Sequence, residues 1–185
     1  TKAFIDGRQI IADAKGEKLT DKQLAEVRRQ ARTICMNWEK VIAEAVFKYA
    51  GSVYKDLDKL KTIIEANGEP EDALKKYVHH WGELKGFALA LQTGRENLGE
   101  TAVRLNRLIG YGPVLANQSQ VICIRNDGSY IKDPGSSLEE YMLHMLKVQK
   151  LMVDAFAIKA MDKDQMAALK GLAGKLGSGG NAEND

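Results

Sequence analysis

The stretch from His79 to Glu83 holds the residues of this sequence whose types and spacing could do chemistry. Residues three or four positions apart are neighbours on a helix surface, so Glu83 would lie beside His80 and also beside His79. A neutral imidazole and a carboxylate can share a cation such as iron or zinc, or the carboxylate can orient the imidazole for proton transfer. The spacing therefore predicts a metal site with His80 and Glu83 as ligands.

Two side chains do not complete a metal site, so further ligands would have to come from other helices. Glu140 and His144, which are four residues apart on a later predicted helix, are the first candidates. A single His–Glu pair could also act as the general base of a hydrolase. The sequence has no nucleophile elbow and no glycine-rich phosphate loop in the right context, so we expect a protein that is not an enzyme.

A structural interpretation of the same residues stays open. His80 falls on the apolar row of its helix, where a histidine is more often a buried, hydrogen-bonded core residue than a ligand, and Glu83 could serve as its partner. His79 falls on a polar row with Lys75 and Lys76 and is expected to lie in solvent.

Composition and length limit the classes of protein that remain. The chain has 185 residues, of which 44% are hydrophobic, and its 27 basic and 25 acidic side chains leave a formal net charge of +2. This balance gives no dense positive field for nucleic-acid binding. The longest apolar stretch, residues 87–91, is far shorter than the roughly 20 residues of a membrane-spanning helix. Cys35 and Cys123 could be free thiols or form one disulfide.

A long helix is expected from about Thr20 to Ala66. Thr20 and Gln23 have the spacing of a capping box at its start, and Asn67-Gly68 is a good stop. Along the helix, apolar residues recur at three- and four-residue steps, which predicts a row that faces a core. That row is Leu24, Val27, Ala31, Ile34, Trp38, Ile42, Ala45 and Tyr49, continued by Val53, Leu57, Leu60 and Ile64. The first twenty residues form a loosely structured segment with at most one short element.

The helix that carries the His–Glu motif should run from about Glu71 to Gln92. Gly82, Gly86 and Ala90 form a row of small residues on it. Two glycines inside a helix cost about 2 kcal/mol relative to alanine, so we expect a reason for them. Either a partner helix approaches this groove closely, or the helix is kinked there.

The rest of the chain is divided by Pro113 and Pro134. A short helix near residues 100–108 is followed by a β-hairpin over 120–132 with a turn at Asn126-Asp-Gly128. Ser136 or Ser137 caps a helix that reaches about residue 159, and a short helix covers 163–176. The sequence thus predicts an all-α bundle of about three to five helices with a small hairpin insertion, a single domain over 1–176 and a flexible glycine-rich tail over 177–185.

Two segments resemble exported bacterial proteins related to the imelysins, in an uncharacterised lipoprotein branch. They are residues 80–92, with the order His-Trp-Gly-Glu-Leu-Lys-Gly-Phe, and residues 108–115, with Gly110-Tyr-Gly-Pro113. The resemblance implies a helical bundle in the periplasm or on the outer surface, linked to iron acquisition, with its His-x-x-Glu ligands at His80 and Glu83. We therefore expect a non-enzymatic exported protein that binds iron, zinc or another divalent cation. The alternative is a structural subunit that contacts identical copies or another protein through its helices and hairpin.

Overall fold

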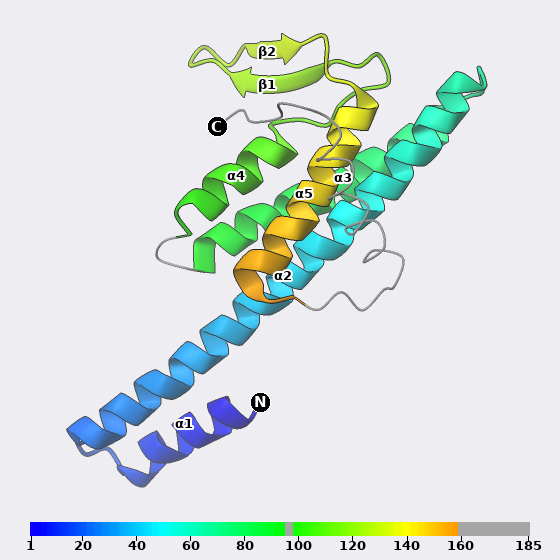
Figure 1. Ribbon diagram of the computed structural model, residues 1–185. Coiled ribbons are helices and arrows are strands. Elements are labelled where there is room, and N and C mark those ends of the chain that lie inside the picture. The colour runs from blue at the N-terminus through cyan, green and yellow to red at the C-terminus, as the bar shows by residue number, and fades with distance from the viewer. Residues whose placement is uncertain (95–97, 159–185) are drawn as a thin grey trace. The chain divides into compact units, whose positions relative to one another are not determined.

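The computed structural model describes residues 1–94 and 98–158, which form five helices and a two-stranded antiparallel sheet (Figure 1). The elements in chain order are α1 (Lys2–Asp13), α2 (Asp21–Glu65), α3 (Glu71–Gly94), α4 (Glu100–Ile109), β1 (Gln120–Ile124), β2 (Tyr130–Asp133) and α5 (Leu138–Phe156). The predicted all-α fold with a hairpin insertion is confirmed. The predicted helix over 163–176 and the tail over 177–185 lie outside the described residues.

The predicted start of α2 is confirmed at the level of single hydrogen bonds. The backbone amide of Gln23 donates to the Thr20 hydroxyl at 3.3 Å, and the Gln23 side chain accepts from the Thr20 amide at 3.0 Å. Two of the amides that a helix leaves unpaired at its first turn are satisfied in this way. The start of α5 is also capped, because the Ser137 hydroxyl accepts a hydrogen bond from the backbone amide of Glu140.

In the N-terminal segment, the one short element that the sequence allowed is the regular helix α1, over residues 2–13. Gly7, in the middle of this helix, is buried. A Cβ atom added to Gly7 would lie 3.4 Å from the Cβ of Gln30 in α2. A side chain as small as alanine would thus make ordinary van der Waals contact with Gln30, and α1 lies against α2 at this point.

The chain consists of two compact units, residues Thr1–Ile42 and Ala43–Asp185. In the first unit, the prediction that the α2 row faces a core is wrong, because Ile34 and Trp38 are exposed, Trp38 by 68%. In the second unit, Val53, Leu57 and Leu60 of the predicted row are buried as expected, but Ala45 and Tyr49 are only half-buried. The buried row of α2 comprises Ala43, Val46, Phe47, Ala50, Val53, Leu57 and Leu60.

The core of the second unit joins this row of α2 to apolar side chains from the three later helices. They include Tyr77, Leu84, Ala88 and Leu91 of α3, Leu105 and Ile109 of α4, and Tyr141, Met145, Val148 and Met152 of α5. The buried Gln149 side chain of α5 donates to the carbonyl oxygen of Phe47 in α2 at 3.1 Å. The second unit therefore has one apolar core and a buried polar link between α2 and α5.

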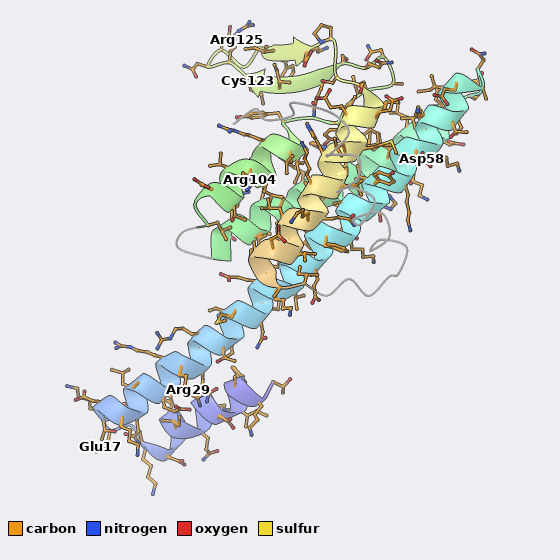
Figure 2. All side chains as sticks on the ribbon, in the orientation of Figure 1. Glu17, Arg29, Asp58, Arg104, Cys123 and Arg125 are labelled. Atoms are coloured by element: carbon orange, nitrogen blue, oxygen red, sulfur yellow. The ribbon has the colours of Figure 1, made fainter. Side chains whose placement is uncertain are left out.

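The predicted hairpin is confirmed, with Gln120 opposite Asp133 and Ile124 opposite Tyr130. A bulge lies between Val121 and Cys123. Both cysteines are free thiols, and Figure 2 labels Cys123 on the hairpin. None of the helices in the described ranges combines the length and apolarity that crossing a bilayer requires.

Candidate functional site

Four polar side chains pair across the contact between α2 and α3 in the second unit. The Nδ1 atom of His80 lies 2.5 Å from Oδ2 of Asp56, and the Tyr49 hydroxyl donates to Oε1 of Glu83 at 3.1 Å. Tyr49 and Asp56 are seven residues apart, which is about two helical turns and brings them to one side of α2. The polar cluster Tyr49–Asp56–His80–Glu83 therefore consists of two cross-helix pairs.

Burial makes the Asp56–His80 pair the more constrained of the two. The Asp56 side chain is only 8% exposed, so its carboxylate needs hydrogen-bond partners in place of water. A contact of 2.5 Å between a carboxylate oxygen and an imidazole nitrogen requires a proton between them. With Asp56 as a carboxylate, which can only accept, Nδ1 of His80 donates this hydrogen bond and Nε2 keeps its lone pair when the ring is neutral.

Glu83 has a separate partner for each of its oxygens. Oε1 accepts the hydrogen bond from Tyr49, whereas Oε2 lies 3.7 Å from Nε2 of His79. The hydrogen bond to the Glu83 carboxylate raises the pKa of Tyr49, so the phenol stays a donor. The Tyr49 ring is also held by stacking on Phe87, with ring centroids 5.4 Å apart.

Other residues of the same motif attach α3 to α4 and α5. Trp81 donates from Nε1 to the Tyr141 hydroxyl at 2.7 Å, and this hydroxyl donates to the carbonyl oxygen of Ile109 at 2.6 Å. Lys85 donates to the carbonyl oxygen of Gly110, also at 2.6 Å. Burial lowers the pKa of Lys85 and raises the pKa of Tyr141. These bonds satisfy carbonyl groups at the end of α4, which its own helix leaves unpaired.

No known protein family, curated protein or solved structure matches this chain. Its function must therefore be argued from the cluster itself.

The predicted ligands His80 and Glu83 lie at the same helix contact, but each has its own partner on α2. His79 lies in solvent as predicted, with a side chain that is 70% exposed. Among residues 1–94 and 98–158, no three His, Cys, Asp or Glu side chains are grouped as a metal ion would require. A cation at this site would thus be held by two protein ligands with water, or by three after a side chain rotates.

The other candidates, Glu140 and His144, lie at a different place in the second unit. They line a cavity of about 130 Å³ between the base of the hairpin and the start of α5. The other residues that line it are Val114, Gln120, Asp133, Ser136, Ser137 and Tyr141. Burial, and then Lys147, lowers the pKa of His144, whose ring meets that of Tyr141 edge-on.

Sequence reasoning missed Tyr49 and Asp56 as partners of the motif. The sequence does contain a signal for Asp56: this carboxylate stands directly before Leu57, which belongs to the apolar row of α2. A charged residue at such a position is almost never fully buried unless it is paired. No comparable signal marks Tyr49, which falls on the predicted row as one more aromatic residue.

The groove predicted at Gly82 and Gly86 is open. A Cβ atom added at either glycine would meet no atom within 4 Å in the described part of the chain. The helix α3 runs unbroken through both glycines, from Glu71 to Gly94. Close packing against residues 1–94 and 98–158 therefore does not account for the two glycines.

Proposed function

We propose that this protein binds a divalent transition-metal cation, iron or zinc, at the polar cluster on α3, with His80 and Glu83 as ligands. The observation that carries the proposal is the 2.5 Å contact between Asp56 and Nδ1 of His80. Histidines that bind metals almost always donate their other ring N–H to a carboxylate, a backbone carbonyl or water. Asp56 thus prepares Nε2 of His80 as a metal ligand.

The chemistry of the donors favours a borderline cation. Imidazole nitrogen suits zinc and iron, and a carboxylate oxygen is accepted by both. The resemblance of residues 80–92 to imelysin-related proteins supports the same pair, and with it a non-enzymatic role in the periplasm or at the outer surface of a bacterium. In that setting the protein would hold or pass on a cation.

Metal titration of the purified chain tests the proposal. Isothermal titration with Zn²⁺, and anaerobically with Fe²⁺, should show saturable binding by the wild type. His80→Ala and Glu83→Ala should each abolish it or weaken it strongly. Asp56→Asn should weaken it by roughly 10–100-fold, as removal of an outer-sphere partner does.

His144→Ala is the matched control, because it also removes a histidine, but one that lies outside the cluster. It should leave the affinity unchanged. Saturable binding that persists at full affinity in both His80→Ala and Glu83→Ala would refute the assignment. Absence of binding by the folded wild type would refute the function.

A second candidate function is self-assembly, and the uncovered apolar surface of the first unit favours it. Ile34, Trp38 and Val41 lie at steps of four and three on one side of α2, and all are exposed. In the second unit, the hairpin has exposed apolar side chains of its own, which are Ile122, Ile124 and Tyr130. Apolar patches of this kind often mark contacts between proteins. Sedimentation velocity at rising concentration tests this role, and a strict monomer would count against it.

A further inference from the structure

His79 and Glu83 leave between them a gap of the size that a cation would need. Nε2 of His79 and Oε2 of Glu83 are 3.7 Å apart, which is too far for a hydrogen bond. Two tetrahedral ligand atoms with bonds of about 2.1 Å to zinc would lie about 3.4 Å from each other. The two atoms are therefore within a few tenths of an ångström of a shared zinc position.

The other contacts of Glu83 and His80 direct a cation to this gap. Tyr49 occupies Oε1 of Glu83, which leaves Oε2 on the side of His79. The 2.5 Å contact between Asp56 and His80, in contrast, has no room for an ion between its atoms. Oε2 of Glu83 thus faces the exposed His79, which lies outside the cluster, while Nδ1 of His80 stays paired with Asp56.

Access to this position is open. The His79 side chain is 70% exposed, and Glu83 is about one-third exposed, so a hydrated ion can reach both. The open space at Gly82 and Gly86, on either side of Glu83 along the helix, removes the side chains that would otherwise crowd the approach. Because His79 and Glu83 are four residues apart, they have the spacing that paired ligands on one helix face use in zinc sites.

We infer that His79 is a cation ligand that acts together with Glu83. This inference rests on the proposed function and assigns it a histidine that the His-x-x-Glu pattern does not include. His79 would then join His80 and Glu83 of the proposed site, and water would fill the remaining positions of the ion. Tyr49 is a positioning residue, because it touches Glu83 and not the ion.

Titration of the full chain with Zn²⁺ and Co²⁺ tests the inference. His79→Ala should weaken Zn²⁺ binding by at least about tenfold, the scale on which metal sites respond to the loss of a partner group. It should also alter the visible absorption of bound Co²⁺, which reports the ligands themselves. Since His79 is exposed, this variant should fold, and its far-ultraviolet circular dichroism checks that it does. Lys75→Ala, an exposed change four residues earlier on α3, is the matched control and should bind as the wild type does.

The outcomes separate this inference from the proposed function. Wild-type affinity and an unchanged Co²⁺ spectrum in His79→Ala, with binding lost in His80→Ala, would overturn the role of His79 and keep the His80–Glu83 site. Weaker binding in both His79→Ala and His80→Ala would support His79 as an additional ligand of the proposed site, whereas loss in His79→Ala alone would support His79 and overturn the assignment of His80. Absence of binding by the wild type would reject both.

Discussion

Two buried tyrosines next to the motif should respond in opposite ways to the loss of a hydroxyl group. The Tyr141 hydroxyl both accepts from Trp81 and donates to Ile109. The Tyr77 hydroxyl is buried and meets no hydrogen-bond partner within bonding distance and angle in the described chain, although the backbone of Val114 offsets part of the rise that burial gives the Tyr77 pKa. Leaving buried polar groups unpaired costs about 1–3 kcal/mol each.

Tyr141→Phe should therefore lower the free energy of unfolding by at least about 2 kcal/mol, because it leaves both Trp81 and Ile109 without their partner. Tyr77→Phe should leave the free energy of unfolding unchanged or raise it by about 1 kcal/mol, because it removes an unsatisfied group. Tyr130→Phe, at an exposed position of the hairpin, is the control and should have no effect. Urea denaturation measures all three, and equal losses for Tyr77 and Tyr141 would contradict the hydrogen-bond assignment.

His144 should make the stability of the protein depend on pH. Burial and the charge of Lys147 lower its pKa in the folded state, while Glu140 acts in the opposite direction. A histidine whose pKa is lowered in the folded state binds fewer protons when folded than when unfolded. Its contribution to the free energy of unfolding is therefore fully present above the unfolded pKa of about 6.5 and is lost as the pH falls below that value. The free energy of unfolding should fall as the pH drops from about 7 toward 5.

The His144→Asn variant should lose the decrease in the free energy of unfolding that His144 causes between pH 7 and pH 5. The carboxylates should still lower the free energy of unfolding below pH 5. Urea denaturation at several pH values measures the difference between variant and wild type. A difference that does not change between pH 7 and pH 5 would show that His144 does not titrate in this range.

At the scale of elements, the two glycines of α3 should be replaceable when no partner covers them. Alanine at Gly82 or Gly86 would meet no neighbouring atom, and both positions are helical and exposed. Each replacement should raise the free energy of unfolding by about 0.5–1 kcal/mol, the difference in helix propensity. Thermal denaturation of Gly82→Ala and Gly86→Ala measures this, with Gly7→Ala as a comparison at a packed position, where the added Cβ atom would contact Gln30. Destabilisation by alanine at Gly82 or Gly86 would show that another surface packs on the groove.

The elements that could be predicted are those with local signals. The capping box at Thr20 begins α2, Ser137 begins α5, and the Asn126-Asp-Gly128 turn joins the two strands. These signals act through hydrogen bonds and backbone angles within a few residues, so one sequence contains them.

The parts that could not be predicted depend on long-range packing. Gly7 looked like a break in α1 until its approach to Gln30 was known. Between residues 43 and 50 of α2 the apolar residues fit two rows, and only the position of the other helices selects Val46 and Ala50 over Ala45 and Tyr49. The candidate site has the same limit, because periodicity brings His80 and Glu83 to one side of α3, whereas their partners Asp56 and Tyr49 come from another helix.

For the molecule as a whole, the near-neutral net charge means that binding depends on local contacts rather than on a long-range electrostatic field. A net charge of +2 on 185 residues provides neither strong attraction nor strong repulsion between copies. Association, if it occurs, would depend on apolar surface, and the first unit exposes a row of it on α2. Trp38 is the largest side chain of that row and is 68% exposed.

Trp38→Ser should therefore reduce self-association without changing the stability of the monomer, since exposed substitutions usually alter the free energy of unfolding by less than about 0.5 kcal/mol. Met36→Ser is the matched control: Met36 is also exposed, but two residues along a helix turn it about 200° from Trp38. Sedimentation velocity over a wide concentration range measures the weight-average mass of each variant. A lower mass for Trp38→Ser alone would assign the contact to the apolar row, because Met36→Ser removes similar apolar area from the other side of the same helix. Equal masses for the two variants and the wild type would show that this row does not join copies of the chain.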